Sequence, residues 1–140
     1  MTLTMTEAQL QAACVSWART LGAPELVVAS CPNEDGGNPS LRRRSAAIGM
    51  MPGFPDMMLF CGGRVQLIEF KTESGQLSQS QLTAHLRLRN AGFNVAVIRT
   101  VQDFAELLVF RKMANPKIKV VKPELAEQPE DQEQGSVTSA

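Results

Sequence analysis

Asp56, Glu69 and Lys71 are the residues whose types and spacing most suggest chemistry. They lie on two apolar runs on either side of Gly62-Gly63, and such a glycine pair supplies the positive φ angles of a two-residue hairpin turn. Counting back from that turn places Asp56 opposite Glu69 on one face of a β-ribbon, with Cβ atoms about 5 Å apart. Lys71, two residues after Glu69, falls on the same face.

Two facing carboxylates on apolar strands repel each other and lose part of their hydration. One of them must then be protonated, or a cation must lie between them. Lys71 is one such cation, and a divalent metal ion is the other. The three residues could instead form a buried ion network that only stabilises the hairpin, although such networks contribute little stability.

Apolar periodicity and turn residues predict the elements that hold this hairpin. An apolar stripe from Leu10 to Leu21 recurs at helical spacing, and a capping box at Thr4 or Thr6 would begin that helix. The other predicted elements are a strand at 26–30, a helix at 41–48, a helix at 78–91, a strand at 93–99 and a last helix capped by Thr100. Their order predicts an α/β fold with a central mixed β-sheet flanked by helices on both sides.

Three polar residues on the predicted helices have a structural explanation of their own. Glu7 begins the first helix, where the macrodipole favours an acid. Ser78 and Gln81 spell a capping box, in which each side chain satisfies a backbone N–H at a helix start. Gln81 also shares a helix face with His85 and would face the hairpin there, so the two uses of its amide are predicted to compete. His85, the only histidine, is predicted to be a surface or packing residue.

Arg42, Arg43 and Arg44 occupy consecutive helical positions and therefore spread over much of the helix circumference. One or two of them could hold phosphate, or all three could form a solvated face. Asn33 lies in a loop rich in Asn, Asp, Gly and Pro, where its side chain has an ordinary role in turn formation.

Composition limits the class of protein. The chain has 140 residues, 44% of them hydrophobic, which suits one domain with its own core. No secretion signal or membrane-spanning run is visible, and three widely spaced cysteines favour neither a disulfide framework nor a zinc site, so a reducing compartment is expected. Residues 1–123 contain all 14 Lys and Arg but only 9 of the 14 acids. This moderately basic body suits a polyanion, although a charge of this size is also ordinary.

The run Pro52-Gly53-Phe54-Pro55-Asp56, followed by Glu69-Phe70-Lys71, resembles the virus-type replication-repair nuclease (VRR-NUC) family of the PD-(D/E)XK nuclease superfamily. Asn33-Glu34, Ser78-x-x-Gln81 and the helix bearing Glu7 resemble flanking motifs of that family, and the resemblance spans most of residues 6–110. We therefore divide the chain into a nuclease-like domain at 1–114 and a C-terminal extension at 115–140. The extension is acidic and is predicted to be disordered from about residue 124.

The resemblance implies a restriction-endonuclease-like core and a metal-dependent deoxyribonuclease that hydrolyses phosphodiester bonds with Mg²⁺, for which Mn²⁺ can substitute. It implies catalytic roles for Asp56, Glu69, Lys71 and Gln81, and metal ligation by Glu7, Asp56, Glu69 and the carbonyl of Phe70. It also implies DNA contacts from Asn33, Ser78 and Gln81, which would join those expected from the arginine types of Arg42, Arg43 and Arg44.

Stand-alone members of the family that this chain resembles act on branched DNA, such as four-way (Holliday) junctions, in phage or bacterial replication, repair or recombination. Two coordinated cuts in a junction need two sites, so a homodimer is expected, located in the cytoplasm of a bacterial cell or a phage-infected host. One alternative is a non-catalytic module that binds DNA junctions or ends, against which the intact Asp, Glu and Lys argue. Another is a nuclease that serves DNA packaging or restriction. The sequence contains no base-reading motif, so it predicts no cleavage sequence.

Overall fold

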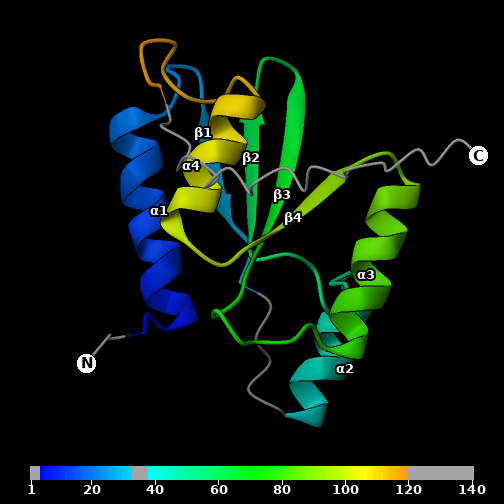
Figure 1. The fold of residues 1–140 in the computed structure, drawn as a ribbon. Coiled ribbons are helices and arrows are strands. Elements are labelled where there is room, and N and C mark those ends of the chain that lie inside the picture. The colour runs from blue at the N-terminus through cyan, green and yellow to red at the C-terminus, as the bar shows by residue number, and fades with distance from the viewer. Residues whose placement is uncertain (1–3, 33–37, 120–140) are drawn as a thin grey trace, which may run out of the picture.

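The computed structural model describes residues 4–32 and 38–119, which form a four-stranded mixed β-sheet flanked by four helices (Figure 1). In chain order the elements are α1 (Glu7–Leu21), β1 (Val27–Ser30), α2 (Pro39–Ala47), β2 (Met57–Cys61), β3 (Arg64–Phe70), α3 (Gln79–Asn90), β4 (Asn94–Ile98) and α4 (Val101–Phe110). The predicted α/β class is therefore confirmed. Asn33 and the acidic part of the extension lie outside the described residues. None of the described helices combines the length and apolar character that crossing a membrane requires.

The strands lie in the order β1-β2-β3-β4, with antiparallel pairing from β1 to β3 and parallel pairing between β3 and β4. Gly62 and Gly63 form the turn between β2 and β3, with φ angles of 57° and 73° that glycine adopts without strain. Cys61 therefore pairs with Arg64, and the register predicted from the glycine pair is correct.

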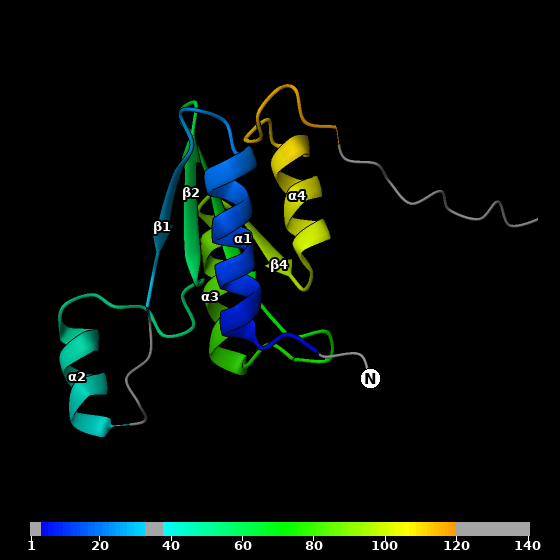
Figure 2. The same cartoon turned by 90° about the vertical axis from the view of Figure 1, so that its left-hand side faces the viewer.

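The two faces of the sheet are covered by different helices. α1 and α4 pack side by side against one face and bury the main apolar core there (Figures 1 and 2). The core includes Leu10, Cys14, Ala18, Met57, Leu59, Cys61, Ile68, Phe70, Ile98, Phe104 and Leu108. Because side chains alternate along a strand, Glu69 points to the opposite face from its neighbours Ile68 and Phe70. On that face it meets α3, whose Ala84 and His85 are buried.

α1 and α3 reach the open end of the hairpin, and each begins with a capping box. The Thr6 hydroxyl accepts from the Gln9 N–H at 3.2 Å, and Gln9 Oε1 accepts from the Thr6 N–H at 2.9 Å, so Thr6 rather than Thr4 begins α1. Ser78 and Gln81 make the same pair of bonds at the start of α3, at 3.3 and 2.9 Å. The caps hold the first turn of each helix in place, and these turns carry Glu7 and Gln81.

α2 begins two residues earlier than the sequence predicts. Asn38 caps it by accepting from the Ser40 N–H at 2.9 Å, and Pro39 suits the first helical position because it needs no N–H donor there. The helix buries no side chain, and it lies apart from the other helices (Figure 2). Its arginines are therefore exposed to solvent rather than packed on the sheet.

At Gly53 the loop before β2 packs against the start of α3. It has a φ of 74°, and a Cβ placed there would overlap the Ser80 carbonyl and crowd the Gln81 backbone nitrogen. Backbone therefore packs directly on backbone at this point, which only glycine permits. Asp56 follows Gly53 by three residues, so the contact links the loop that carries Asp56 to the helix that carries Gln81.

Candidate active site

Asp56 and Glu69 lie one step beyond the last ladder pair of the hairpin, Met57 with Ile68, and so occupy opposite positions on adjacent strands. Asp56 Oδ2 accepts a hydrogen bond from the Phe70 N–H at 2.8 Å, which takes the place of a ladder bond at the end of β3. The Asp56 carboxylate is thereby fixed beside Glu69, whose side chain is buried with an exposed fraction of 2%.

The environment of Glu69 disfavours its ionised form. Burial, together with the negative charge of Asp56, raises the pKa of Glu69 from 4.5 to about 8, and the Lys71 ammonium partly offsets this rise. Without a divalent cation, the carboxyl group therefore keeps its proton at neutral pH. This is one of the two outcomes expected when two carboxylates face each other.

Gln81 uses the two ends of its amide for different partners. Its Nε2 donates to Glu69 Oε1 at 2.7 Å, while its Oε1 accepts from the Ser78 N–H at 2.9 Å. The predicted competition between the capping role and the site-facing role is wrong, because an amide carries a donor group and an acceptor atom on opposite sides. Ser78 caps α3 and holds Gln81 in this orientation.

His85 is a residue that the sequence reasoning did not place in the site. It lies one helical turn after Gln81 with an exposed fraction of 1%, and its Nε2 lies 3.7 Å from Glu69 Oε2. Burial lowers the pKa of His85, and the charges of Arg89 and Lys71 lower it further, so the ring is neutral near Glu69. The spacing of four residues from Gln81 was the signal in the sequence, because such residues share one helix face.

Lys71 and Glu7 meet at the open end of the hairpin. Lys71 Nζ lies 3.8 Å from Glu7 Oε1, and the Lys71 side chain is largely buried whereas the Glu7 side chain is half exposed. The first residue of α1 is thus brought to the hairpin, as the resemblance implied. Its carboxylate pairs with Lys71, whose charge also lowers the pKa of Glu69.

The fit of this site to a metal ion rests on Asp56 and Glu69. Glu69 Oε2 is buried without a hydrogen-bond partner among the described residues, and a divalent cation would both bind this oxygen and reverse the rise in the pKa of Glu69. Within residues 4–32 and 38–119, no three His, Cys, Asp or Glu side chains converge closely enough to hold a metal by themselves. A site here would therefore include backbone or solvent oxygens beside the carboxylate pair.

The other residues predicted to contact DNA do not all lie next to Asp56 and Glu69. Arg42, Arg43 and Arg44 are exposed on α2, which shares no packed face with the sheet. A pocket of about 410 Å³ between the loop before β2 and α3 is lined by Pro52, Ser80 and Arg87, among others. Arg87, which the sequence reasoning did not single out, thus lies on the helix that contacts Glu69.

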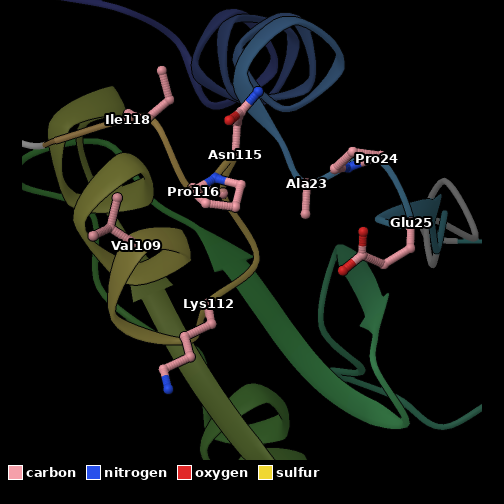
Figure 3. A pocket seen from close by; sticks show the side chains of 9 residues that line it. Ala23, Pro24, Glu25, Val109, Lys112, Asn115, Pro116 and Ile118 are labelled. Carbon is pink, nitrogen blue, oxygen red and sulfur yellow. The ribbon is translucent and has the colours of Figure 1, made fainter.

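Another pocket, of about 330 Å³, has a lining that includes neither Asp56 nor Glu69 (Figure 3). It is lined by Ala23, Pro24, Glu25, Val109, Lys112, Ala114, Asn115, Pro116 and Ile118. These residues gather beyond the C-terminal end of α1, whereas Glu7 begins that helix. A helix of 15 residues is about 22 Å long, so this pocket is separate from the site.

The pKa of Glu69 predicts how stability depends on pH. In chelator, the unfolded chain releases the Glu69 proton near pH 4.5 and the folded chain holds it up to about pH 8, so the free energy of unfolding falls as pH rises through this window. Glu69→Gln should remove this loss, which is on the order of a few kcal/mol. Thermal unfolding in chelator across the window measures it. Glu73→Gln, an exposed control, should keep the wild-type slope, and a Glu69→Gln variant with that same slope would contradict the assigned cause.

Gln81→Ala should affect both stability and activity, because the residue has two partners. Loss of the cap costs about 1 kcal/mol, and loss of the donor to Glu69 should reduce cleavage about 10- to 100-fold. Ser78→Ala is the matched control, because it removes the other half of the capping box and leaves the Glu69 contact. Both variants should therefore melt at a lower temperature than wild type, whereas only Gln81→Ala should lose the contribution of the Glu69 contact to the cleavage rate. Cleavage by Gln81→Ala at the wild-type rate would show that the Gln81 bond to Glu69 has no catalytic effect.

Comparison with known proteins supports the fold and identifies the family. A solved structure described as a VRR_NUC domain protein superposes with a TM-score of 0.62 at 14% identity, covering 76% of this chain and 88% of that one. Another, described as a VRR_NUC domain, superposes with a TM-score of 0.52 at 21% identity, covering 74% and 94%. The comparison with curated proteins gave no match. The VRR-NUC domain family matches residues 4–102, which include the hairpin, the start of α1 and all of α3, and the chain therefore belongs to the VRR-NUC family of nucleases.

Proposed function

We propose that this protein is a Mg²⁺-dependent, structure-specific DNA endonuclease that hydrolyses phosphodiester bonds in branched DNA, such as four-way junctions. The observation that carries the proposal is the pairing of Asp56 with a buried Glu69 whose Oε2 has no hydrogen-bond partner among the described residues. Such a pair is costly without a cation, and Lys71 lies beside it. Membership of a nuclease family supports the reaction class, and the resemblance to stand-alone members supports branched DNA.

Oxygen donors at the end of the hairpin would hold the ion. They are the carboxylates of Asp56 and Glu69, with the carbonyl of Phe70 and the carboxylate of Glu7 as further candidates. The Phe70 N–H donates to Asp56, and the N–H and C=O of one residue in a strand point to the same side, so its carbonyl faces the same edge. Oxygen ligands suit Mg²⁺, and Mn²⁺ is expected to substitute. When bound, the ion supplies charge to offset the phosphate and makes water acidic enough for attack.

The residues around the carboxylates orient the reacting groups. Lys71 has three N–H donors, so its ammonium can contact Glu7 and also stabilise charge on a phosphate oxygen or orient the attacking water. Gln81 holds Glu69 in place from α3. Glu69 lies in β3, Glu7 and Gln81 lie in the first turns of two helices, and Asp56 and Lys71 directly adjoin β2 and β3, so regular elements position the catalytic groups.

DNA would approach the open end of the hairpin, near the basic side chains of α2 and of the second half of α3. The arginines of α2 at positions 42–44 are exposed, and Arg87 lines the pocket next to Pro52 and Ser80. Arginine and lysine contacts to phosphate position DNA without reading its sequence. We infer that these residues contribute affinity, which should weaken as salt concentration rises.

The proposal is tested with labelled duplex, flap and four-way junction DNA, each incubated with Mg²⁺ or with chelator. We expect cleavage of branched DNA in Mg²⁺ and none in chelator. Asp56→Asn is the control for contaminating nucleases, since it should bind the same DNA without cutting it. Binding of junctions with no cleavage by wild type would instead favour the non-catalytic binding module. Cleavage of duplex as fast as of junction would remove the preference for branched DNA.

A homodimer follows from the proposed reaction, because two strands of a junction must be cut in a coordinated way. Leu82 and Leu86 lie one turn apart on α3 and are half exposed, so they offer an apolar contact surface. Light scattering should give twice the monomer mass, and Leu82→Lys combined with Leu86→Lys should shift it toward the monomer. A monomeric wild type, with and without junction DNA, would argue against coordinated junction cutting but not against cleavage itself.

A further inference from the structure

α3 presents two polar side chains to the same carboxylate. Gln81 and His85 are four residues apart and therefore share one helix face. Gln81 Nε2 contacts Glu69 Oε1 at 2.7 Å, and His85 Nε2 faces the second oxygen, Oε2, at 3.7 Å. The first distance is a hydrogen bond, whereas the second is too long to be one.

The atoms at the longer distance are buried and unsatisfied. Glu69 Oε2 and both ring nitrogens of His85 have no hydrogen-bond partner among the described residues. Buried polar groups that lack partners are unfavourable, so a state in which Nε2 and Oε2 approach each other is favoured once Oε2 becomes a strong acceptor. An approach of about 0.8 Å would complete a normal hydrogen bond, which a small side-chain rotation supplies.

We propose that His85 is a positioning residue that donates from Nε2 to Oε2 of ionised Glu69 when a divalent cation is bound. α3 then holds both carboxylate oxygens, and the lone pairs that remain face Asp56 and the cation. The inference rests on the proposed function, because it concerns the same metal site. Hydrogen bonds of this kind orient a ligand, and their loss usually weakens metal affinity by about 10- to 100-fold.

Three substitutions separate positioning from packing. In His85→Gln the side-chain N–H lies near the position of the original Nε2. In His85→Asn the side chain is too short for its N–H to reach Glu69 Oε2. His85→Leu fills the same space without a hydrogen-bond donor. For each variant, the Mg²⁺ concentration that gives half of the Mg²⁺-induced rise in melting temperature is measured without DNA. We expect His85→Asn and His85→Leu to need about 10- to 100-fold more Mg²⁺ than wild type, and His85→Gln to lie within a few-fold of it. A role in packing alone would change the melting temperature in chelator and leave the half-saturating Mg²⁺ concentration unchanged.

His85 is also the only histidine, so the nitrogen resonances of its ring identify its tautomer in untagged wild-type protein. With saturating Mg²⁺ we expect the Nε2–H tautomer, and the Nδ1–H tautomer would overturn the inference even if a variant failed to fold. Mg²⁺ binding by His85→Leu that matches wild type would overturn it as well, while leaving the metal site intact. If Mg²⁺ has no effect on wild type, both the metal site and the inference are wrong.

Discussion

Alanine at Asp56, Glu69 or Lys71 is expected to abolish cleavage, with a fall in rate on the order of 10³-fold or more at saturating DNA and Mg²⁺. The two acids lie opposite each other at the end of the hairpin, and Lys71 is held beside them by Glu7. In the proposed function, removing either acid would take away charge that holds the cation, and removing Lys71 would take away charge that faces the phosphate. Single-turnover cleavage of labelled junctions measures the effect.

Glu73→Ala is the matched control for these variants, because Glu73 is an exposed acid two residues after Lys71. It should cleave at the wild-type rate. Activity close to wild type in any of the three test variants would remove that residue from the catalytic site. A loss in all variants including Glu73→Ala would point to damage to the fold, which circular dichroism would detect.

The second large effect concerns stability without metal, where asparagine and alanine at position 56 should behave in opposite ways. Asp56→Asn removes the charge that raises the pKa of Glu69 but keeps an oxygen that accepts from the Phe70 N–H. In chelator at about pH 8.5, this variant should melt at or above the wild-type temperature. It should also bind DNA more tightly in chelator, since one negative charge near the phosphate is gone.

Asp56→Ala leaves the Phe70 N–H without its acceptor and should lose about 1–3 kcal/mol of stability.

Melting curves and DNA-binding isotherms at fixed salt distinguish this interpretation from a stabilising ion network. In such a network, Asp56→Asn would leave Lys71 with fewer partners in a largely buried position and lower the melting temperature. A clear loss of stability in Asp56→Asn would therefore contradict the assigned repulsion and, with it, the argument for a metal between the two acids.

The parts of the site that the sequence predicted correctly are those determined by local geometry. Two glycines with positive φ set the hairpin register, and that register alone places Asp56 opposite Glu69. The capping boxes at Thr6 and Ser78 likewise depend on residues three positions apart. Short-range patterns of this kind carry their own structural cause, so they can be predicted without knowledge of the surrounding fold.

The contacts that α3 makes with Glu69 could not be predicted in this way, because the large apolar residues of α3 do not mark its buried face. Leu82 and Leu86 are exposed, while Ala84 and His85 are buried against the sheet. The position of His85 next to Glu69 was therefore not predicted, although His85 and Gln81 were placed on one helix face. The second partner of Gln81 depends on where α3 lies over β3, which is a tertiary contact that no local pattern contains.

The contact of Gly53 with the first turn of α3 has a consequence for how precisely the site can be built. A loop of this kind ordinarily tolerates insertions and substitutions and varies in position. Here the backbone of Gly53 packs on the backbone of Ser80 and Gln81, so a side chain at position 53 would push the loop away from the helix. A substitution at Gly53 is therefore expected to displace Asp56 relative to Gln81, although it changes neither of these residues.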